Sequence, residues 1–301
     1  MRIMLFGKNG QVGWELRRTL APLGEVDAVD YPEVDFLDLA ALRVFTLKAQ
    51  PDLIVNAAAY TAVDQAESEP EVAMRVNGEA PGVLAEIARE RGIGLVHFST
   101  DYVFDGMKGE PYTEDDEPNP INVYGHTKLT GDRAIQESGC THLILRTSWV
   151  YGTRGSNFFL TMLRLARERE EISVVNDQIG SPTWSRAIAE ATAQILRCIR
   201  EETGSTSVFS LGEAGGLYNT CSGGEASWLE FARAILEREQ KENSQRSPKL
   251  VPISSKEYQS QAMRPGYSVL DTMKAERRFE IKIHTWQEQL ESCWQSKDPI
   301  Q

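Results

Sequence analysis

The chain has 301 residues, and its 44 Asp and Glu outnumber its 32 Lys and Arg, which gives a formal net charge of −12. This charge repels phosphate backbones and no basic cluster offsets it, so nucleic acid is excluded as an expected partner. The four cysteines are widely spaced and only four histidines occur, so the sequence predicts neither a zinc site nor a disulfide framework. No stretch approaches the roughly 20 apolar residues of a membrane span, and the N-terminal apolar stretch is too short for a signal peptide. We therefore expect a soluble cytoplasmic protein.

The N-terminal residues predict a strand, a glycine turn and a helix. A mostly apolar run over 1–6 is followed by Gly7, Gly10 and Gly13 in the spacing G-x-x-G-x-x-G, and then by a helical pattern over 14–20. Glycines let a pyrophosphate approach the main chain, and a helix N-terminus supplies free N–H groups and a partial positive charge. The turn favours dinucleotide binding, with a plain glycine turn as the alternative.

A second strand is predicted over 25–29, and Asp30 follows it. An acidic residue about 20 residues after the glycine turn is where a ribose 2′-hydroxyl is bound, so Asp30 favours NADH. The alternative is an ordinary strand-end aspartate, because Asp27, Asp35 and Asp38 lie nearby and any of them could serve in the turn.

Strands and helices then alternate along the first half of the chain. We expect helices over 39–49 and 71–92, and strands over 53–55, 95–98 and 142–146. Such alternation predicts an α/β fold with a doubly wound, Rossmann-type parallel sheet. We expect residues 1–151 to form a dinucleotide-binding domain. Residues 152–301 are expected to form mainly a smaller, mixed substrate domain, with some segments returning to the first domain.

The segment from Ser99 to Lys128 carries the candidate catalytic groups. Ligands of open α/β sheets bind beyond the carboxyl ends of the strands, which places Thr100 at the crevice. If residues 123–137 are helical, Tyr124 and Lys128 lie one turn apart on the same face. The ammonium would then lower the pKa of the phenol, which ordinarily lies near ~10. A phenol tuned in this way can protonate a carbonyl oxygen as hydride arrives.

In the second half we expect helices over 157–169, 187–199 and 226–239, a strand over 172–175, and two terminal helices. The acidic, proline-broken segment 111–120 predicts a surface loop that either covers the site or is only a solvated connection. Residues 201–216 are rich in Gly, Ser, Thr and Glu and predict a long loop or hairpin. Trp149 stands at a strand end, where it is either a core aromatic or a contact to a sugar ring.

Seven motifs together carry a resemblance to a known family. They are G-K-N-G-Q-V-G from Gly7, N-A-A-A-Y-T-A-V-D from Asn56, S-T-D-Y-V-F-D-G from Ser99, Y-G-H-T-K from Tyr124, R-T-S-W-V-Y-G from Arg146, N-D-Q-I-G-S-P-T from Asn176 and R-P-G-Y-S-V-L-D from Arg264. In this order they resemble the extended short-chain dehydrogenase/reductase family and, more narrowly, its dTDP-4-dehydrorhamnose reductases. The resemblance spans Met1 to about Gln289.

The resemblance implies an NADPH- or NADH-dependent oxidoreductase that reduces the C4 carbonyl of dTDP-4-dehydro-L-rhamnose to dTDP-L-rhamnose, a step of nucleotide-sugar biosynthesis. Tyr124 would donate the proton, Lys128 would tune it and hold the nicotinamide ribose, and Thr100 would bind the substrate. The expected cofactor contacts are Gly7, Gly10, Gln11, Val12, Gly13, Asp30, Asp35, Phe36, Ala59, Tyr60, Thr61, Tyr124 and Lys128. The expected substrate contacts are Thr100, Asp101, Tyr102, Trp149 and Arg264.

Arg264 is expected to bind the diphosphate of the substrate, because the planar guanidinium matches phosphate oxygens bidentately. The alternative is an arginine paired with a nearby carboxylate.

Two other functions remain as alternatives. A nucleotide-sugar epimerase or dehydratase shares the fold, but Tyr102 stands where a dehydratase normally has an acidic residue. A non-catalytic dinucleotide-binding regulatory subunit is also known in this family, although the intact Thr100, Tyr124 and Lys128 argue against it.

Some family members bridge two subunits through magnesium held by acidic residues. Glu15 matches one of these residues, but Arg186 stands where a second acid would be. We therefore expect no metal site, and either a monomer or a homodimer.

Overall fold

The structure is a computed structural model that describes residues 1–203, 209, 211–243 and 247–297. Six parallel strands form its central sheet, in the order β10-β5-β4-β3-β1-β2. Their bounds are β1 (Arg2–Phe6), β2 (Glu25–Val29), β3 (Leu53–Asn56), β4 (Gly94–Thr100), β5 (His142–Thr147) and β10 (Gly216–Asn219). The predicted doubly wound α/β fold is confirmed. The strand order reverses between β1 and β3, which is the switch point where open α/β sheets bind ligands.

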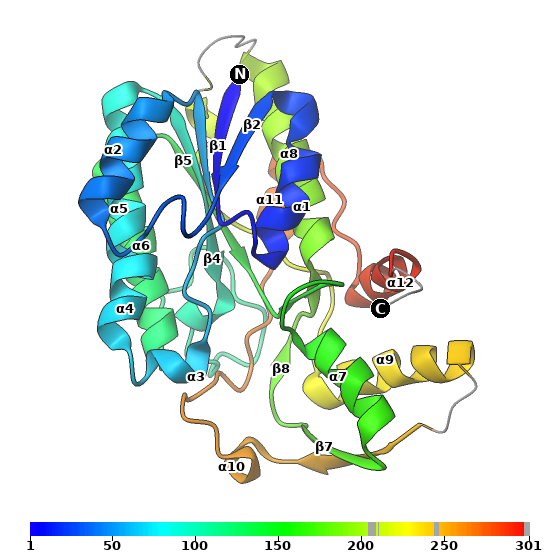
Figure 1. The fold of residues 1–301 in the computed structure, drawn as a ribbon. Helices are drawn as coiled ribbons and strands as arrows, with labels where there is room; N and C mark the ends of the chain where they lie inside the picture. Colours follow the sequence, from blue (N-terminus) through cyan, green and yellow to red (C-terminus); the bar gives the residue numbers. More distant parts are fainter. Residues whose placement is uncertain (204–208, 210, 244–246, 298–301) are drawn as a thin grey trace.

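Helices cover both faces of the sheet (Figure 1). One face carries α2 (Leu39–Ala49), α5 (Ala80–Arg91) and α6 (Val123–Ser138), and the other carries α1 (Gln11–Thr19), α8 (Ser185–Thr203) and α11 (Met273–Phe279). Each face of the sheet forms a hydrophobic core with the helices that cover it. Successive side chains of a strand point to opposite faces, so Leu95 packs into the core under α2, α5 and α6, and Val96 packs into the core under α1, α8 and α11. The strands are buried on both faces, which explains their nearly continuous apolar runs.

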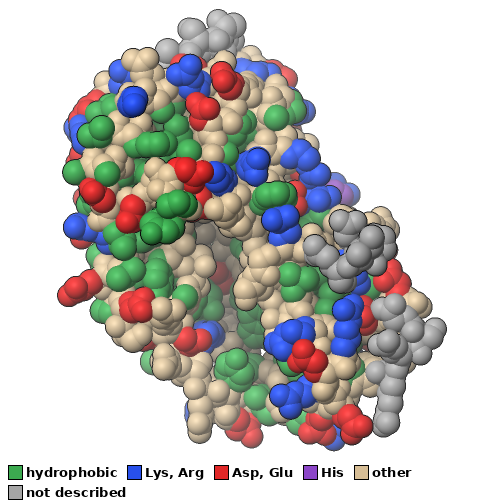
Figure 2. All heavy atoms as spheres, viewed as in Figure 1, with side chains coloured by type: hydrophobic (Ala, Val, Ile, Leu, Met, Phe, Trp, Pro, Cys, Tyr) green, Lys and Arg blue, Asp and Glu red, His purple; other side chains and the backbone are tan. Residues whose placement is uncertain are grey.

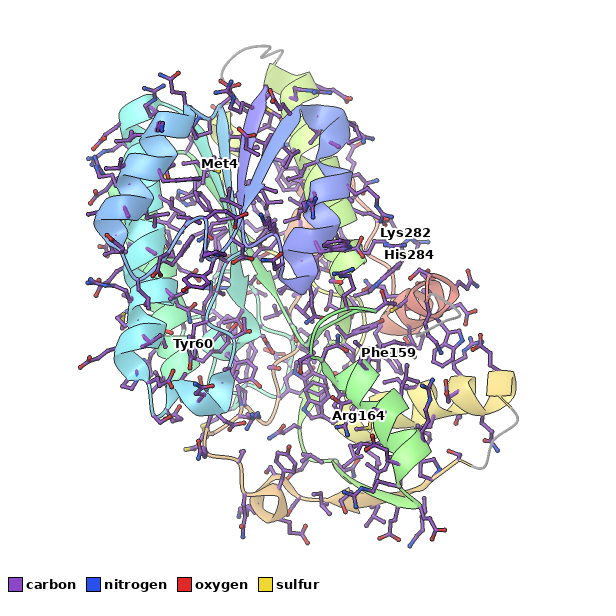
Figure 3. The ribbon with its side chains drawn as sticks, viewed as in Figure 1. Met4, Tyr60, Phe159, Arg164, Lys282 and His284 are labelled. Carbon is purple, nitrogen blue, oxygen red and sulfur yellow. The ribbon has the colours of Figure 1, made fainter. Side chains whose placement is uncertain are left out.

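The second part of the molecule has its own core. Figure 1 shows α7 (Phe158–Glu168) and α9 (Trp228–Asn243) beside β7 (Glu171–Val175), below the sheet. The core contains Phe159, which Figure 3 labels on α7, together with Phe231 and Trp286. The other elements of this half are β6 (Val150–Tyr151), β8 (Ile179–Gly180), β9 (Thr183–Trp184), β11 (Ala226–Ser227), β12 (Lys249–Ile253), α10 (Ser255–Tyr258) and α12 (Trp286–Gln295).

After residue 152 the chain returns to the first part of the molecule, which is the part that contains the six-stranded sheet. Helix α8 packs against α1, and β10 extends the sheet beside β5. The prediction for residues 201–216 was partly wrong, because α8 continues to Thr203, a 3-10 turn η4 (Gly212–Ala214) follows later, and Gly216 begins β10. Residues 204–208 and 210 of that segment lie outside the described residues.

The helix predicted over 71–92 is confirmed in its extent, since helical residues run without a break from Pro70 to Arg91, but three segments make it up. They are α4 (Pro70–Met74), the π-helical turn η2 (Arg75–Glu79) and α5. Pro81 has no N–H to donate to the carbonyl of Asn77, and its ring would clash with that carbonyl in a regular α-helix. The wider turn accommodates the proline.

The remaining short helices are η1 (Ala21–Leu23), α3 (Val63–Ala66) and η3 (Asp101–Val103). Within the residues that the structure describes, no helix is both long and apolar enough to cross a bilayer.

Candidate active site

A cleft of about 810 Å³ opens at the switch point of the sheet. Figure 2 shows this face of the molecule hollowed between its upper and lower parts, and Figure 3 places Tyr60 just beyond β3, on the side that faces the second part. Most of the predicted site residues line the cleft, namely Gly7, Gly10, Gln11, Val12, Asp30, Asp35, Phe36, Ala59, Tyr60, Thr61, Thr100, Asp101, Tyr102, Tyr124, Lys128 and Trp149. Gly13 and Arg264 do not belong to this lining.

The glycine turn needs glycine at two positions for different reasons. Gly7 has a φ of +85°, and a Cβ there would lie 2.6 Å from the carbonyl carbon of Ala57. A Cβ on Gly13 would lie 1.9 Å from the Gly7 carbonyl oxygen. Gly13 therefore lets α1 pack tightly under the turn instead of lining the cleft. Gln11 and Val12 at the start of α1 line the cleft. The first N–H groups of a helix have no partner within it, an arrangement that suits a pyrophosphate.

Asp30 is held at the rim of the cleft by two backbone groups. Its carboxylate accepts hydrogen bonds from the N–H of Asn9 and of Tyr31, both at 2.9 Å. Nearby, Lys8 forms an ion pair with Glu33. Among the described residues that line the cleft, Lys128 is the only lysine or arginine. An anchored carboxylate without a neighbouring unpaired cation suits a ribose 2′-hydroxyl better than a 2′-phosphate.

Thr100, Tyr102 and Tyr124 meet where β4 ends. The Thr100 hydroxyl accepts a hydrogen bond from the N–H of Tyr102 at 3.1 Å and also pairs with the phenol of Tyr124. The Tyr102 and Tyr124 rings meet edge to face, with centroids 5.6 Å apart. Asn122 starts α6 by accepting a hydrogen bond from the N–H of Gly125 at 2.7 Å, which fixes Tyr124 in the first turn. The predicted helix thus places Tyr124 beside Thr100.

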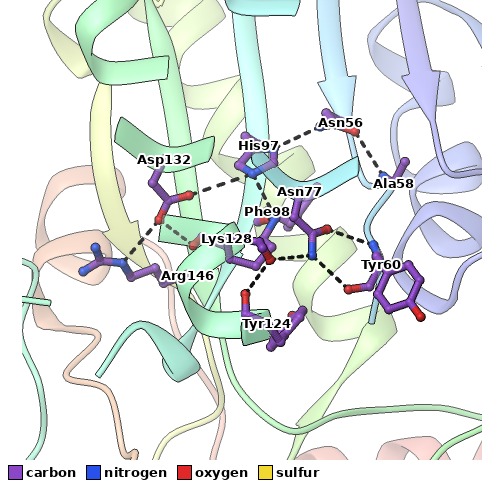
Figure 4. A network of polar contacts seen from close by, with 12 residues as sticks. Asn56, Ala58, Tyr60, Asn77, His97, Phe98, Tyr124, Lys128, Asp132 and Arg146 are labelled. Carbon is purple, nitrogen blue, oxygen red and sulfur yellow. Dashed lines mark hydrogen bonds and ion pairs between the residues drawn. The ribbon is translucent and has the colours of Figure 1, made fainter. Parts of the chain in front are cut away.

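Lys128 bonds to strand β4. Its Nζ donates to the carbonyl of Phe98 at 2.7 Å and lies 3.0 Å from Nε2 of His97, as Figure 4 shows. Burial lowers the pKa of Lys128 to about 8.

The prediction that Lys128 lowers the pKa of Tyr124 was wrong for this structure. Burial of the phenol is the largest influence on the pKa of Tyr124 and raises it well above the ordinary value. The negative charge of Asp101 raises this pKa further. Tyr124 is therefore a protonated phenol at neutral pH.

Asp101 is buried directly after Thr100. Its carboxylate accepts hydrogen bonds from the hydroxyls of Thr100 and Ser148, each at 3.1 Å. Burial raises the pKa of Asp101 to about 6, although hydrogen bonds from Ser268, Ser148 and Thr100 oppose this rise. The carboxylate orients the Thr100 hydroxyl.

Trp149 belongs both to the wall of the cleft and to a packed aromatic pair. It has a positive φ of 44°, and its ring stacks on Trp228 with centroids 3.5 Å apart and an interplanar angle of 2°. A Cβ on Gly180 would lie 2.3 Å from the Trp149 ring, so the glycine makes room for it. Sequence reasoning missed Trp228, which also lines the cleft, because only the fold brings the start of α9 to this point.

Arg264 is paired with a carboxylate. Its two terminal nitrogens bond Asp64 Oδ1 at 3.1 Å and Oδ2 at 2.6 Å. The N–H of Ala262 also donates to Asp64, at 3.0 Å, and the guanidinium holds the pKa of Asp64 below its usual value. Because Asp64 lies on α3, these bonds join the first part to the 262–264 segment. The alternative of a carboxylate-paired arginine is the arrangement found here.

Arg186 forms an ion pair with Glu15, at 3.1 Å between Nε and Oε2. Arg186 therefore pairs with the Glu15 carboxylate, which the family resemblance associates with magnesium. Within the described ranges, no cluster of three or more His, Cys, Asp and Glu side chains has the arrangement of a metal site.

Comparisons with known proteins agree with this geometry. Residues 1–298 match the family described as RmlD substrate binding domain. The chain is 42% identical to a dTDP-4-dehydrorhamnose reductase of Salmonella typhimurium over 95% of each chain, and 44% identical to one of Burkholderia thailandensis over 97% of this chain and 98% of the relative.

Solved structures extend the comparison. A dTDP-4-dehydrorhamnose reductase of Bacillus anthracis in complex with NADP superposes with a TM-score of 0.86 at 34% identity, covering 98% of this chain and 99% of that one. A UDP-glucose 4-epimerase of Thermus thermophilus in complex with NAD reaches a TM-score of 0.75 over 98% of this chain and 99% of that one, but at 20% identity it shares the fold alone.

Proposed function

The chain belongs to the RmlD substrate binding domain family, and from this we propose that it is an NADPH- or NADH-dependent oxidoreductase that reduces the C4 carbonyl of dTDP-4-dehydro-L-rhamnose to dTDP-L-rhamnose. The observation that carries the proposal is the meeting of Thr100, Tyr124 and Lys128 at one end of a cleft whose other end is the glycine turn. The relatives named dTDP-4-dehydrorhamnose reductase support the choice of substrate.

The first part of the cleft fits a dinucleotide. The turn at Gly7 and Gly10 and the start of α1 would hold the pyrophosphate, Asp30 would bind the adenine-side ribose, and Ala59 with its small neighbours would lie along the cofactor. Phe36 packs edge to face on Phe6 at 5.5 Å and closes the adenine side. The reduced nicotinamide supplies the hydride when it is bound.

Tyr124 would act as the general acid. Because burial keeps its phenol protonated, it can give its proton to the oxygen of the carbonyl as C4 is reduced. Thr100, already paired with the phenol, would turn its single O–H from Asp101 to the same oxygen and hold it within reach. Lys128 lies one helical turn from Tyr124, and would hold the nicotinamide ribose.

The nucleotide sugar would lie against the second part. Asp101, Tyr102 and Trp149 are proposed to contact the sugar, and Arg264 the diphosphate, which would require its guanidinium to exchange Asp64 for phosphate oxygens. We also propose that the protein works in the cytoplasm as a monomer or homodimer. The division into residues 1–151 and 152–301 remains a proposal.

One assay tests this function. NADH and NADPH oxidation are measured with dTDP-4-dehydro-L-rhamnose and with UDP-4-keto sugars, and Tyr124→Phe serves as the control for the catalytic site. We expect oxidation with the dTDP sugar that the variant loses. Turnover confined to a UDP sugar, or equal rates in the variant, would overturn the proposal, and no turnover with any sugar would favour the non-catalytic alternative.

A further inference from the structure

A network of buried polar side chains runs from β3 through β4 to Lys128 on α6 (Figure 4). The Asn56 side-chain amide lies 3.1 Å from Nδ1 of His97, and Nε2 of the same imidazole lies 3.0 Å from Nζ of Lys128. All three side chains are almost completely buried, and His97 has no exposed surface. Both nitrogens of the imidazole therefore face protein groups.

The hydrogen-bond donors and acceptors around His97 determine which of its ring nitrogens carries the proton. The backbone N–H of Ala58 can only donate, and it lies 3.2 Å from Asn56 Oδ1. The other end of the amide, the NH₂ group, must then face His97 and donate to Nδ1. A neutral imidazole has one N–H, so a histidine that accepts at Nδ1 carries its proton on Nε2.

This tautomer constrains Lys128. An Nε2–H group is a donor, and an ammonium has three donors and no acceptor, so the two cannot bond to each other. A neutral amine has a lone pair, and can accept from Nε2–H while still donating to the carbonyl of Phe98. The observed contacts of Asn56, His97 and Lys128 are mutually satisfied only with the amine form.

Few charged side chains surround the polar network of Asn56, His97 and Lys128. From α6, Asp132 Oδ1 lies 3.9 Å from His97 Nε2, which is too far for a hydrogen bond, and Asp132 Oδ2 accepts from the Ser99 hydroxyl at 2.6 Å. From β5, Arg146 Nε lies 3.9 Å from the same carboxylate. Burial is the largest influence on the pKa of His97 and lowers it well below the ordinary value, which keeps the imidazole neutral. Asp132 favours the ammonium of Lys128, whereas burial opposes it.

We propose that His97, held in its Nε2–H tautomer by Asn56, is a positioning residue that stabilises the neutral amine form of Lys128. This deepens the proposed function, on which its consequence for catalysis rests. An ammonium whose amine form is stabilised gives up a proton readily. Because the proposed hold on the nicotinamide ribose relies on the ammonium, stabilising the amine lowers the pH above which activity falls. The Tyr124 phenolate left after proton transfer takes a proton from water in the open cleft.

Nitrogen NMR of the protein without cofactor tests the tautomer directly. The chain has only four histidines, so a sample labelled with ¹⁵N at histidine gives a simple spectrum, and His97→Gln identifies the His97 signals. We expect a neutral ring protonated at Nε2 from about pH 6 to 9. A proton on Nδ1, or an imidazolium in this range, would overturn the proposal whether or not the protein proves to be a reductase.

Asn56→Asp tests what sets the tautomer. The carboxylate keeps an acceptor for Ala58 N–H but presents an acceptor to Nδ1 as well, so we expect the proton to move to Nδ1 in the same NMR experiment. An unchanged Nε2–H tautomer would show that Asn56 does not set it.

The pH profile of kcat/KM separates this role from a merely structural one. Gln at position 97 can turn its carbonyl oxygen to the ammonium, so His97→Gln should move the basic limb of the profile upward by about one pH unit or more. The matched control is His142→Gln, because His142 lies on the neighbouring strand and contacts the Cys140 carbonyl at 3.0 Å. A limb that stays in place in His97→Gln, or moves equally in both variants, would overturn the proposal.

Discussion

Burial holds the Tyr124 phenol in its protonated form, which is the form a proton donor needs. Tyr124→Phe removes the transferable proton and leaves the ring in contact with Tyr102. We expect kcat to fall roughly 10²-fold or more, the scale of general acid catalysis, while NAD(P)H affinity stays the same. Steady-state kinetics with a fluorescence titration of the cofactor measures both quantities. Turnover close to that of the wild type would remove Tyr124 from the mechanism.

Asp30 is the residue expected to set cofactor preference. Its carboxylate is fixed by Asn9 and Tyr31, so it can accept from a ribose 2′-hydroxyl and repel a 2′-phosphate. Asp30→Ala should raise the use of NADPH relative to NADH. The measurement is the ratio of kcat/KM for the two cofactors, and an unmoved ratio would mean that another residue contacts this ribose.

Residue spacing predicted some contacts of the site and missed others. The four-residue interval placed Tyr124 and Lys128 on one helix face, and the strand end placed Thr100 at the crevice. The spacing could not show that Lys128 bonds to His97 and Phe98, because those contacts depend on how deeply α6 packs against β4. His97 itself stands in an apolar strand, where nothing in the sequence separates a structural histidine from one that contacts a lysine.

At the scale of elements, α6 reaches the catalytic strand because a glycine follows Tyr124. A Cβ on Gly125 would lie 2.2 Å from the carbonyl oxygen of Tyr102. Gly125→Ala should push the start of α6 away from η3, lower kcat, and destabilise the fold by about 1–3 kcal/mol.

Thermal unfolding and steady-state kinetics check this prediction, with Gly82→Ala as the matched control in α5. A Cβ on Gly82 would make an ordinary 3.4 Å contact with Ala134, so this variant should be neutral or more stable by up to about 1 kcal/mol. Equal effects of the two substitutions would contradict the account of the α6 contact.

The Asp64–Arg264 pair connects α3 to the 262–264 segment. If Arg264 binds the diphosphate, Arg264→Ala should raise the KM of the nucleotide sugar roughly tenfold or more and change kcat less, because the contact is remote from the reacting carbonyl. Asp64→Asn frees the guanidinium and should leave this KM unchanged or lower it. Kinetics of the two variants decide the matter. Equal increases in KM would assign the pair to holding the two parts together instead of to phosphate binding.

Local patterns predicted regular elements better than interrupted ones. The helix over 39–49 and the strand over 25–29 have the bounds that the sequence predicts. The apolar periodicity of 71–92 hid the π-helical turn, since it is the backbone of Pro81 that forces the interruption. Strand β10 has only four residues and no pattern of its own, so its place beside β5 depends on the completed sheet.

On the scale of the whole molecule, the alternation of strands and helices was enough to predict a doubly wound parallel sheet. The arrangement of the second half was not predictable in the same way. Its chain crosses between the parts more than once, with α8 packed on α1 and α7 packed on α9. The resulting cleft combines residues from Gly7, directly after β1, to Trp228 on α9, which explains why Trp228 could be assigned to it only in three dimensions.

The most direct test of the central claim is to follow the hydride. NADPH or NADH carrying deuterium at the transferable C4 position is incubated with dTDP-4-dehydro-L-rhamnose, and the product is analysed by mass spectrometry and NMR. We predict that one deuterium appears at C4 of dTDP-L-rhamnose for each cofactor oxidised. A sugar that is converted without deuterium at C4, or with the cofactor left reduced, would contradict the account and would indicate epimerase or dehydratase chemistry instead.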